Sequence, residues 1–300
     1  MYASGSTAVV TGAAGGIGRA IASRLAAEGF RLVLSDLDPA VEGVATGLGA
    51  VAVVGDCASD AGATRLVEAA VAELDRVDIF FANAGTDVGR GLETPDAAWA
   101  TALEVNVMAH VRAARLLVPR WLEGQGVEPR GDRTESGVPE VEPRGDRTES
   151  GVPEVEPRGD RTESGVPEGR FVVTASAAGL LTMLGSAPYS VSKHAAVAFA
   201  EWLRATYGHR GIVVQAICPQ GVRTRMLDEA GPLKELLSRD RALEPEEVAE
   251  VVWQALQGDA FFVLPHPEVA GYYRARASEP DAWLAGMGRL QAKLDAGAQP

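Results

Sequence analysis

Residues 7–28 restrict the possible folds of this chain more than any other stretch. The apolar run TAVVT leads directly into Gly12-Ala-Ala-Gly-Gly16-Ile17-Gly18 and then into an alanine-rich helical pattern. Glycines between a strand and a helix permit a tight turn, a close approach of the backbone to a ligand, and close packing of helix on strand. The free N–H groups at the start of such a helix attract phosphate. A simple turn between a strand and a helix could contain the same glycines. The place of the motif, after the first strand and at the start of the first helix, favours a loop that binds the phosphates of a dinucleotide (a dinucleotide cradle).

The rest of the chain alternates β-branched runs with alanine- and leucine-rich runs. The expected strands are Thr7–Thr11, Arg31–Ser35, Val51–Val54, Ile79–Ala82, Phe171–Thr174, Val213–Ile217 and Phe261–Leu264. The expected helices span 16–28, 60–74, 95–122, 188–207 and 246–257. Strands that are apolar on both faces are typical of a parallel sheet covered on both sides. The pattern predicts an α/β fold, a doubly wound parallel sheet (Rossmann-type) in a single domain, with ligands at the carboxyl ends of the strands.

Residues 127–168 interrupt this alternation. The unit VEPRGDRTESGVPE occurs there three times in succession, and each copy has only two valines among prolines, glycines and charges. Such a unit cannot bury a core, so we expect a disordered tandem-repeat insertion in a helix-to-strand loop. Residues 1–126 and 169–300 would then form one domain, with the insertion remote from the ligand edge. Each copy also contains Arg-Gly-Asp, which leaves an adhesion or scaffold function as an alternative to a chance tripeptide copied by duplication.

Composition narrows the class of function. Acidic residues outnumber basic ones 41 to 28, and the net charge of −13 argues against nucleic acid or an anionic membrane as partner. No apolar run reaches the ~18 residues that cross a bilayer, and the first residues lack the pattern of a signal peptide. Two cysteines without a CxxC spacing fit a reduced, cytoplasmic protein. The four histidines lack metal-ligand spacing, so no metal is expected.

Asp36 follows the second strand, eighteen residues after Gly18. A carboxylate at this point accepts hydrogen bonds from the ribose hydroxyls of an adenosine and repels a 2′-phosphate. Neither the next three residues nor the glycine-rich loop supplies a cation that would favour that phosphate. NAD is therefore favoured over NADP, with a helix cap as the alternative interpretation of Asp36.

Tyr189 and Lys193 are about one helical turn apart and would share one face of the helix at 188–207. Free tyrosine, with a pKa near ~10, is a poor base at neutral pH. A nearby ammonium group favours the phenolate and lowers that pKa. A surface pair could have the same spacing, but other polar residues stand at strand ends or in the long helix before it: Asn83, Asn106 and Ser176.

Taken in order, these motifs resemble the short-chain dehydrogenase/reductase superfamily over residues 5–226, apart from the repeat. The resemblance rests on Thr11-Gly12-x3-Gly16-Ile17-Gly18, Asn83-Ala84-Gly85, Asn106, Ser176, Tyr189-x3-Lys193 and Pro219-Gln-Gly221. Two positions depart from the family pattern, namely Ala82, where asparagine is common, and Gln220, within the Pro-Gly pair. Neither departure touches the residues that transfer a proton.

The resemblance implies a role for each matching residue. Tyr189 would be the general acid/base, Lys193 would lower its pKa and bind the nicotinamide ribose, and Ser176 would hold the substrate oxygen. Asn106 would anchor a water that passes the proton onward from the lysine. The implied cofactor contacts are Gly12, Gly16, Ile17, Gly18, Asp36, Asp56 at the adenine, Asn83, Ala84, Gly85, Tyr189, Lys193, Pro219, Gly221, Val222 and Thr224.

We therefore expect an NAD-dependent oxidoreductase that transfers a hydride between nicotinamide and a secondary alcohol or ketone. Apolar residues in 178–184, together with Met226, suggest a hydrophobic small-molecule substrate. Aromatic residues in the C-terminal tail could line the substrate mouth or a subunit contact, and the family implies a homo-oligomer, a tetramer or a dimer. The alternative is an NAD-binding redox-sensing regulator without turnover, which would not need the set Asn106, Ser176, Tyr189 and Lys193.

Overall fold

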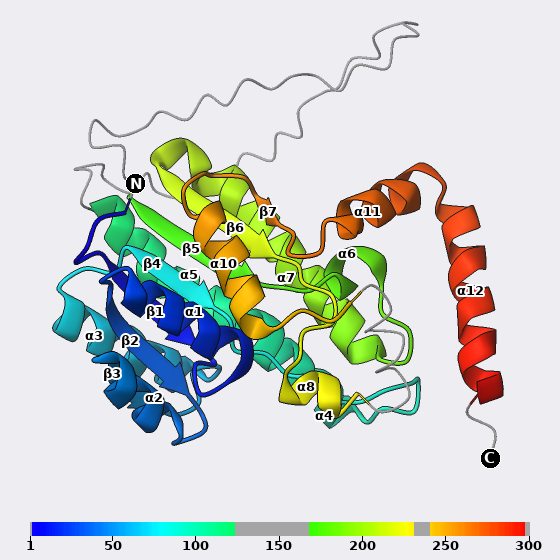
Figure 1. Cartoon of the computed structure of the whole chain (residues 1–300), viewed down its shortest axis with the longest axis horizontal. Coiled ribbons are helices and arrows are strands. Elements are labelled where there is room, and N and C mark those ends of the chain that lie inside the picture. Colours follow the sequence, from blue (N-terminus) through cyan, green and yellow to red (C-terminus); the bar gives the residue numbers. More distant parts are fainter. Residues whose placement is uncertain (1, 124–167, 231–240, 298–300) are drawn as a thin grey trace, which may run out of the picture.

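A computed structural model gives the structure of residues 2–123, 168–230 and 241–297. One parallel sheet of seven strands, in the order β3-β2-β1-β4-β5-β6-β7, crosses the molecule (Figure 1). Its strands are β1 (Thr7–Thr11), β2 (Arg31–Asp36), β3 (Val51–Val54), β4 (Ile79–Ala82), β5 (Gly169–Thr174), β6 (Ile212–Ile217) and β7 (Phe262–Val263). The predicted doubly wound parallel sheet in a single domain is confirmed.

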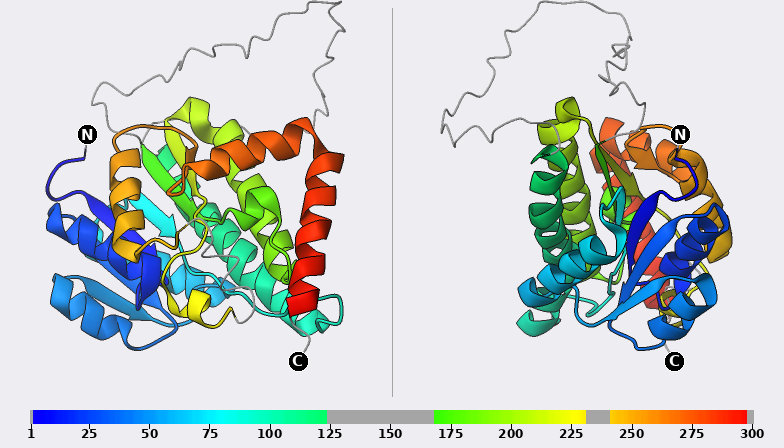
Figure 2. Two further views of the ribbon diagram at one scale, coloured as in Figure 1. Left: turned by 45° about the vertical axis from the view of Figure 1, so that its right-hand side comes forward. Right: turned by 90° about the vertical axis from the view of Figure 1, so that its left-hand side faces the viewer.

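Helices cover both faces of the sheet, as Figure 2 shows. On one face lie α3 (Asp60–Leu74), α5 (Ala109–Glu123) and α7 (Ala187–Tyr207), and on the other α1 (Gly16–Ala27), α2 (Val41–Leu48) and α10 (Pro245–Ala255). Alternate residues of one strand serve the two cores: Val9 packs in the first, whereas Ala8 and Val10 pack in the second. This alternation follows from the two-residue period of a strand, and it explains why the strands read as continuous apolar runs.

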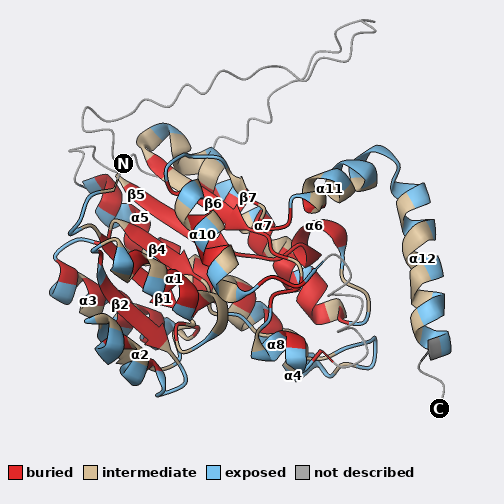
Figure 3. Ribbon diagram, viewed as in Figure 1, coloured by how far each residue is buried: buried red, intermediate tan, exposed pale blue. Residues whose placement is uncertain are grey.

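The helix predicted over 95–122 consists of three pieces. They are α4 (Asp96–Leu103), a π-helical turn η1 (Glu104–Met108), and α5. The sequence reading did not identify α2, α6 (Ala178–Leu181), α8 (Arg225–Asp228), α11 (Glu268–Ser278) or α12 (Pro280–Gly297). The last two helices run along the outside of the molecule, and Figure 3 shows α12 as largely exposed or half-buried.

The chain leaves α5 at Glu123 and enters β5 at Gly169. Almost all of the three repeat copies, and the disorder expected of them, lie outside the described residues. On the near side of that interval, the Trp121 indole donates a hydrogen bond to the Val77 carbonyl at 2.7 Å and packs against Gly169. Within the described residues, no helix is long and apolar enough to cross a membrane.

Candidate active site

The loop between β1 and α1 is shaped by close backbone contacts. Gly12 has φ +66°, and a Cβ there would lie 2.9 Å from the Ala84 Cα. Gly18 lies against the Gly12 carbonyl and the Asn83 side chain, which leaves no room for a Cβ. The Asn83 amide in turn donates to the Thr11 carbonyl at 2.9 Å. The end of β4 thus holds the loop in a turn that only glycine can adopt, with the N-terminus of α1 open for phosphate.

Asp36 lies at the end of β2, directly beside this loop. Its Oδ2 accepts a hydrogen bond from the Ala14 N–H at 2.9 Å, and its Oδ1 accepts one from the Asp38 N–H at 3.0 Å. The helix-cap interpretation is wrong, because α2 begins only at Val41 and its cap residue is Ala40. The carboxylate is instead held against the glycine-rich loop, which is the position expected of a residue that hydrogen-bonds an adenosine ribose.

The segment after β6 returns to the same loop. A Cβ on Gly16, which has φ +53°, would lie 3.1 Å from the Thr224 Cγ2. Val222 bridges to Leu243, so this return is held from the far side. Asp56, just beyond the end of β3, accepts a hydrogen bond from the Ala58 N–H at 2.9 Å. The predicted cofactor segments therefore gather at the carboxyl ends of the strands, and their glycine cradle fits a dinucleotide phosphate.

Tyr189 and Lys193 both lie on the buried face of α7. The Lys193 Nζ is 5.7 Å from the centre of the Tyr189 ring and donates to the Thr174 carbonyl, at the end of β5, at 2.8 Å. Ser176 follows two residues later; its Oγ accepts from the Ala178 N–H at 3.1 Å and lies 3.4 Å from the Pro219 carbonyl. The helix and the strand end therefore place the hydroxyl, phenol and ammonium groups together.

Asn106 lies in the middle of the π-helical turn and is fully buried. Its Oδ1 accepts from the Thr86 N–H, and its Nδ2 donates to the Thr86 carbonyl and the Ser192 Oγ, all at 2.9 Å. A Cβ on Gly85 would lie 3.2 Å from both the Asn106 Oδ1 and the Lys193 Nζ. Irregular π turns recur at functional sites, and this one brings Asn106 next to the ammonium group.

The sequence was compared with models of known protein families. The model described as short chain dehydrogenase matches residues 6–127 and 164–234, on both sides of the repeat. The chain belongs to the short-chain dehydrogenase family. It is accordingly an oxidoreductase, as its motifs predicted.

Individual members of the short-chain dehydrogenase family are similar over most of their length. The 1-deoxy-11-beta-hydroxypentalenate dehydrogenase of Streptomyces exfoliatus is 31% identical, with 92% of this chain and 88% of the relative covered. The meso-2,3-butanediol dehydrogenase of Serratia marcescens is 28% identical, with 85% and 88% covered. A solved short-chain dehydrogenase/reductase of Burkholderia phymatum, in complex with NAD, has a TM-score of 0.72 and 26% identity, and the match covers 94% of this chain and 96% of that chain.

The electrostatics of this short-chain dehydrogenase differ from the expectation in one respect. Burial raises the pKa of Tyr189 to about 12, although its hydrogen bond with Ser176 acts to lower it. Burial also lowers the pKa of Lys193 to about 8. The expected lowering of the tyrosine pKa by the ammonium group is therefore not a property of the protein without its cofactor, because desolvation of the phenolate dominates.

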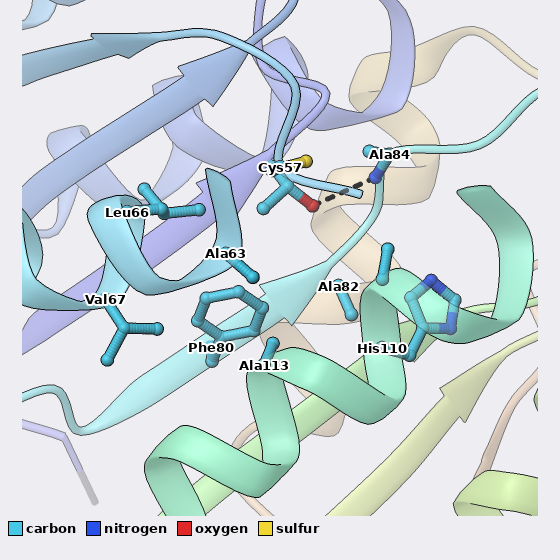
Figure 4. Close-up of a pocket in the computed structure, with 11 residues that line it drawn as sticks. Cys57, Ala63, Leu66, Val67, Phe80, Ala82, Ala84, His110 and Ala113 are labelled. Atoms are coloured by element: carbon cyan, nitrogen blue, oxygen red, sulfur yellow. Dashed lines mark hydrogen bonds between the residues drawn. The ribbon is translucent and has the colours of Figure 1, made fainter. Parts of the chain in front are cut away.

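The sequence predicts that His110, one turn beyond Asn106, is a surface or helix-packing residue rather than a metal ligand. Its ring lies beside Ala84 and lines a small cavity of about 10 Å³ that Cys57 and Phe80 also border (Figure 4). Neither ring nitrogen makes a geometrically acceptable hydrogen bond to the described residues. Burial, with the positive charge of Lys193 as a second cause, lowers the pKa of His110 to about 3. Only the three-dimensional contacts identify this residue, since its spacing in the sequence carries no signal.

Cys218 directly precedes Pro219, at the start of the predicted cofactor segment after β6. It is fully buried in the core, and burial raises the pKa of its thiol to about 12. A packed side chain, rather than a reactive thiol, is therefore the reading that the structure favours. Among the residues that the structure describes, no group of three or more histidine, cysteine or acidic side chains is placed to hold a metal ion.

Proposed function

We propose that this short-chain dehydrogenase interconverts a secondary alcohol and a ketone with NAD as the hydride carrier. The observation that carries the proposal is the meeting of Ser176, Tyr189 and Lys193 beside the glycine cradle. One strand end and one helix contribute these side chains, and all three are buried. Parallel sheets place ligands at this edge, so a substrate oxygen and a nicotinamide would meet the three groups together.

The residues of the chain have separable tasks. When bound, NAD supplies the acceptor or donor of the hydride. The Tyr189 phenol gives a proton to the substrate oxygen in reduction and takes one in oxidation, and Ser176 hydrogen-bonds the same oxygen. Lys193 supplies a buried positive charge that favours the phenolate. Asn106, close to the Lys193 Nζ through Gly85, is proposed to hold the water that carries the proton onward.

We propose NAD rather than NADP as the preferred cofactor. Asp36 supports this choice, because its carboxylate is fixed by two backbone N–H groups at the end of β2. A 2′-phosphate brought to that point would meet a negative charge whose position cannot easily change. The NAD bound in the Burkholderia phymatum relative agrees with the proposal.

We propose that the substrate is a hydrophobic small molecule. Of the apolar residues that the sequence suggested, Leu180 and Leu181 pack within the hydrophobic core. Met183 and Leu184 are only half-buried, and Met226 is exposed, so these are the side chains left to contact a substrate. The names of the pentalenate and butanediol relatives both specify hydroxyl-bearing substrates.

The test is oxidation of NADH, and reduction of NAD, with a panel of apolar ketones and secondary alcohols matched against sugars. Tyr189→Phe should lower kcat by at least about a hundredfold, since it removes the acid/base group, while NADH binding stays within about twofold of the wild type. Turnover of sugars alone would overturn the apolar substrate class.

A redox-sensing regulator remains the alternative function. It predicts that no member of the panel turns over and that Tyr189→Phe leaves NADH binding and any downstream response unchanged. The buried set of Ser176, Tyr189 and Lys193 favours the enzyme, since binding alone does not require a buried ammonium group.

We further propose a cytoplasmic homo-oligomer, a dimer or tetramer, with no nucleic-acid or membrane partner. Two free cysteines agree with a reducing compartment. On α7, Trp202 is 55% exposed and stacks on Phe199, while Val191 is 49% exposed, and such side chains suit a subunit contact.

The repeat is proposed to be dispensable for catalysis. Deletion of residues 127–168 should leave kcat within about twofold of the wild type, whereas a scaffold function would be lost.

A further inference from the structure

A carboxylate that belongs to none of the family motifs lies at the edge of the proposed active site. Asp87 follows β4 by five residues, and its side chain is only 10% exposed. Its Oδ1 accepts a hydrogen bond from the Ser186 hydroxyl at 2.7 Å and from the Arg90 guanidinium at 3.0 Å. Charged groups are rarely buried to this degree unless they are paired, and Asp87 is paired with both Ser186 and Arg90.

Ser186 is the residue from which the catalytic helix starts. It precedes α7 directly, yet its side chain makes no capping bond to the helix. The hydroxyl instead donates to Asp87, although serine at this position normally accepts from the first turn. The first helical N–H, that of Ala187, donates to the Arg90 carbonyl at 2.9 Å. The loop after β4 therefore takes over the capping of α7, three residues before Tyr189.

The same loop packs closely on the first turn of the helix. A Cβ on Gly89, which has φ +79°, would lie 3.2 Å from the Pro188 Cγ. The Arg90 N–H donates to the Thr94 hydroxyl at 2.8 Å, which closes the loop on itself. Movement of Asp87 would thus be transmitted through backbone contacts to the segment that carries Tyr189.

Asp87 also acts on Tyr189 through its charge. Among the groups around the phenol, Ser176 lowers the pKa of Tyr189, whereas the carboxylate of Asp87 and the sulfur of Cys218 raise it. Lys193 contributes a positive charge from the same helix, 5.7 Å from the ring. Arg90, 47% exposed, neutralises Asp87 only in part, because a solvated guanidinium is screened by water.

We propose that Asp87 is a positioning residue for the catalytic helix: it holds the start of α7 through Ser186 and, partly neutralised by Arg90, places a negative field on Tyr189. The field favours the protonated phenol. Because alcohol oxidation requires the phenolate, Asp87 shifts the onset of alcohol oxidation to higher pH. This shift rests on the proposed function, whereas the field itself does not.

The field can be measured without a substrate. The protein is labelled with fluorotyrosine, the Tyr189 signal is assigned by its loss in Tyr189→Phe, and the fluorine resonance is titrated with pH. Asp87→Asn keeps an acceptor for Ser186 but removes the charge, so the Tyr189 midpoint should fall by about half a pH unit or more. Arg90→Gln should raise it. Glu93→Gln, which removes an exposed charge from the same loop, is the matched control and should leave the midpoint unchanged.

The pair Asp87→Asn and Arg90→Gln completes the test. If Arg90 acts only by neutralising Asp87, the double variant should match Asp87→Asn alone, because the effects of coupled charges are not additive. Midpoints that do not move in opposite directions in the two single variants would overturn the proposal. Equal effects of Glu93→Gln and Asp87→Asn would overturn it too, since the position of the carboxylate would then be irrelevant.

Turnover gives a second readout for the positioning role. Ser186→Ala keeps the charge and removes the hydrogen bond, so kcat should fall by about tenfold with little change in substrate KM. In Asp87→Asn, the alkaline-side optimum for alcohol oxidation should move to lower pH. Unchanged kcat in Ser186→Ala would contradict the positioning role. If no substrate is turned over at all, the proposed function fails, but the fluorine titration still decides the field on Tyr189.

Discussion

The core of the proposed cofactor side, from Gly12 to Asp36, comes from one continuous stretch of chain, whereas the proposed substrate side is assembled from α6, the start of α7, α8 and α11. On the cofactor side, each polar residue stands at a strand end, and the strand sets its position. On the substrate side, contacts between segments that are far apart in the sequence set the positions of the side chains. The Arg276 guanidinium on α11 donates to the Leu180 carbonyl on α6, and Thr182 is held at φ +67°. The positions of the side chains can therefore be predicted from the local sequence on the cofactor side but not on the substrate side.

The largest effect is expected from a substitution at Gly12, where the cofactor side is most tightly packed. Gly12→Ala places a Cβ 2.9 Å from the Ala84 Cα at a positive φ, so we expect a loss of about 2 kcal/mol or more in the free energy of unfolding and no measurable NADH binding. Gly15→Ala is the matched variant, because its Cβ meets nothing within 4 Å. Thermal unfolding should show an unchanged Tm for Gly15→Ala but weaker NADH binding. Equal loss of Tm in both variants would show that the loop is not shaped by contact with β4.

The next effect concerns His110, beneath the cofactor side. Its pKa is lowered to about 3 in the folded protein, so between pH 6.5 and 3 the unfolded chain binds a proton that the folded protein does not. The free energy of unfolding therefore falls as the pH drops, by about 2 kcal/mol between pH 7 and 5 from this group. Denaturant titrations should show that His110→Leu removes this component.

The exposed His209 supplies the control for that experiment. His209→Leu should leave the pH dependence as in the wild type, because it removes only an exposed side chain and leaves the buried His110 in place. A slope that His110→Leu does not reduce would mean that the imidazole finds a proton-accepting partner in solution.

The smallest effect is expected at the far end of the substrate side. Helix α12 contacts α11 through the rings of Trp283 and Tyr272, and its Leu284 is 63% exposed. Removal of residues 280–300 should change the Tm by no more than about 2 °C, because it uncovers little of either core. NADH affinity should be unaffected. A drop of about 5 °C or more would show that the C-terminal helix is part of the folded core.

The contrast explains what could be predicted from the sequence. The strand at Thr7–Thr11 and the glycine-rich loop follow from local pattern, and the family motifs named the residues that the structure gathers around the cradle. Helix α2 went unseen because its eight residues include two glycines. The π turn at Asn106 has no signature in a continuous helical pattern, and the prolines at the start of α11 and α12 indicate loops in the sequence.

Two further properties lie beyond pattern altogether. The raised pKa of Tyr189 depends on how much water the folded site excludes, and spacing alone does not reveal burial. Asp87 acquires its partner Ser186 from 99 positions away. A charge in a loop of unremarkable composition gives no sign in the sequence that it will meet the start of α7.

The central claim, that the glycine cradle and Asp36 make this a NAD-using member of its family, is tested most directly by titrating the purified protein with NADH and NADPH. The enhancement of nicotinamide fluorescence reports both affinities. We expect NADH to bind at least about tenfold more tightly than NADPH, a difference of about 1.4 kcal/mol, and Asp36→Ala to narrow that ratio. Equal affinities, or tighter binding of NADPH, would contradict the role of Asp36, and binding of neither would contradict the cradle itself.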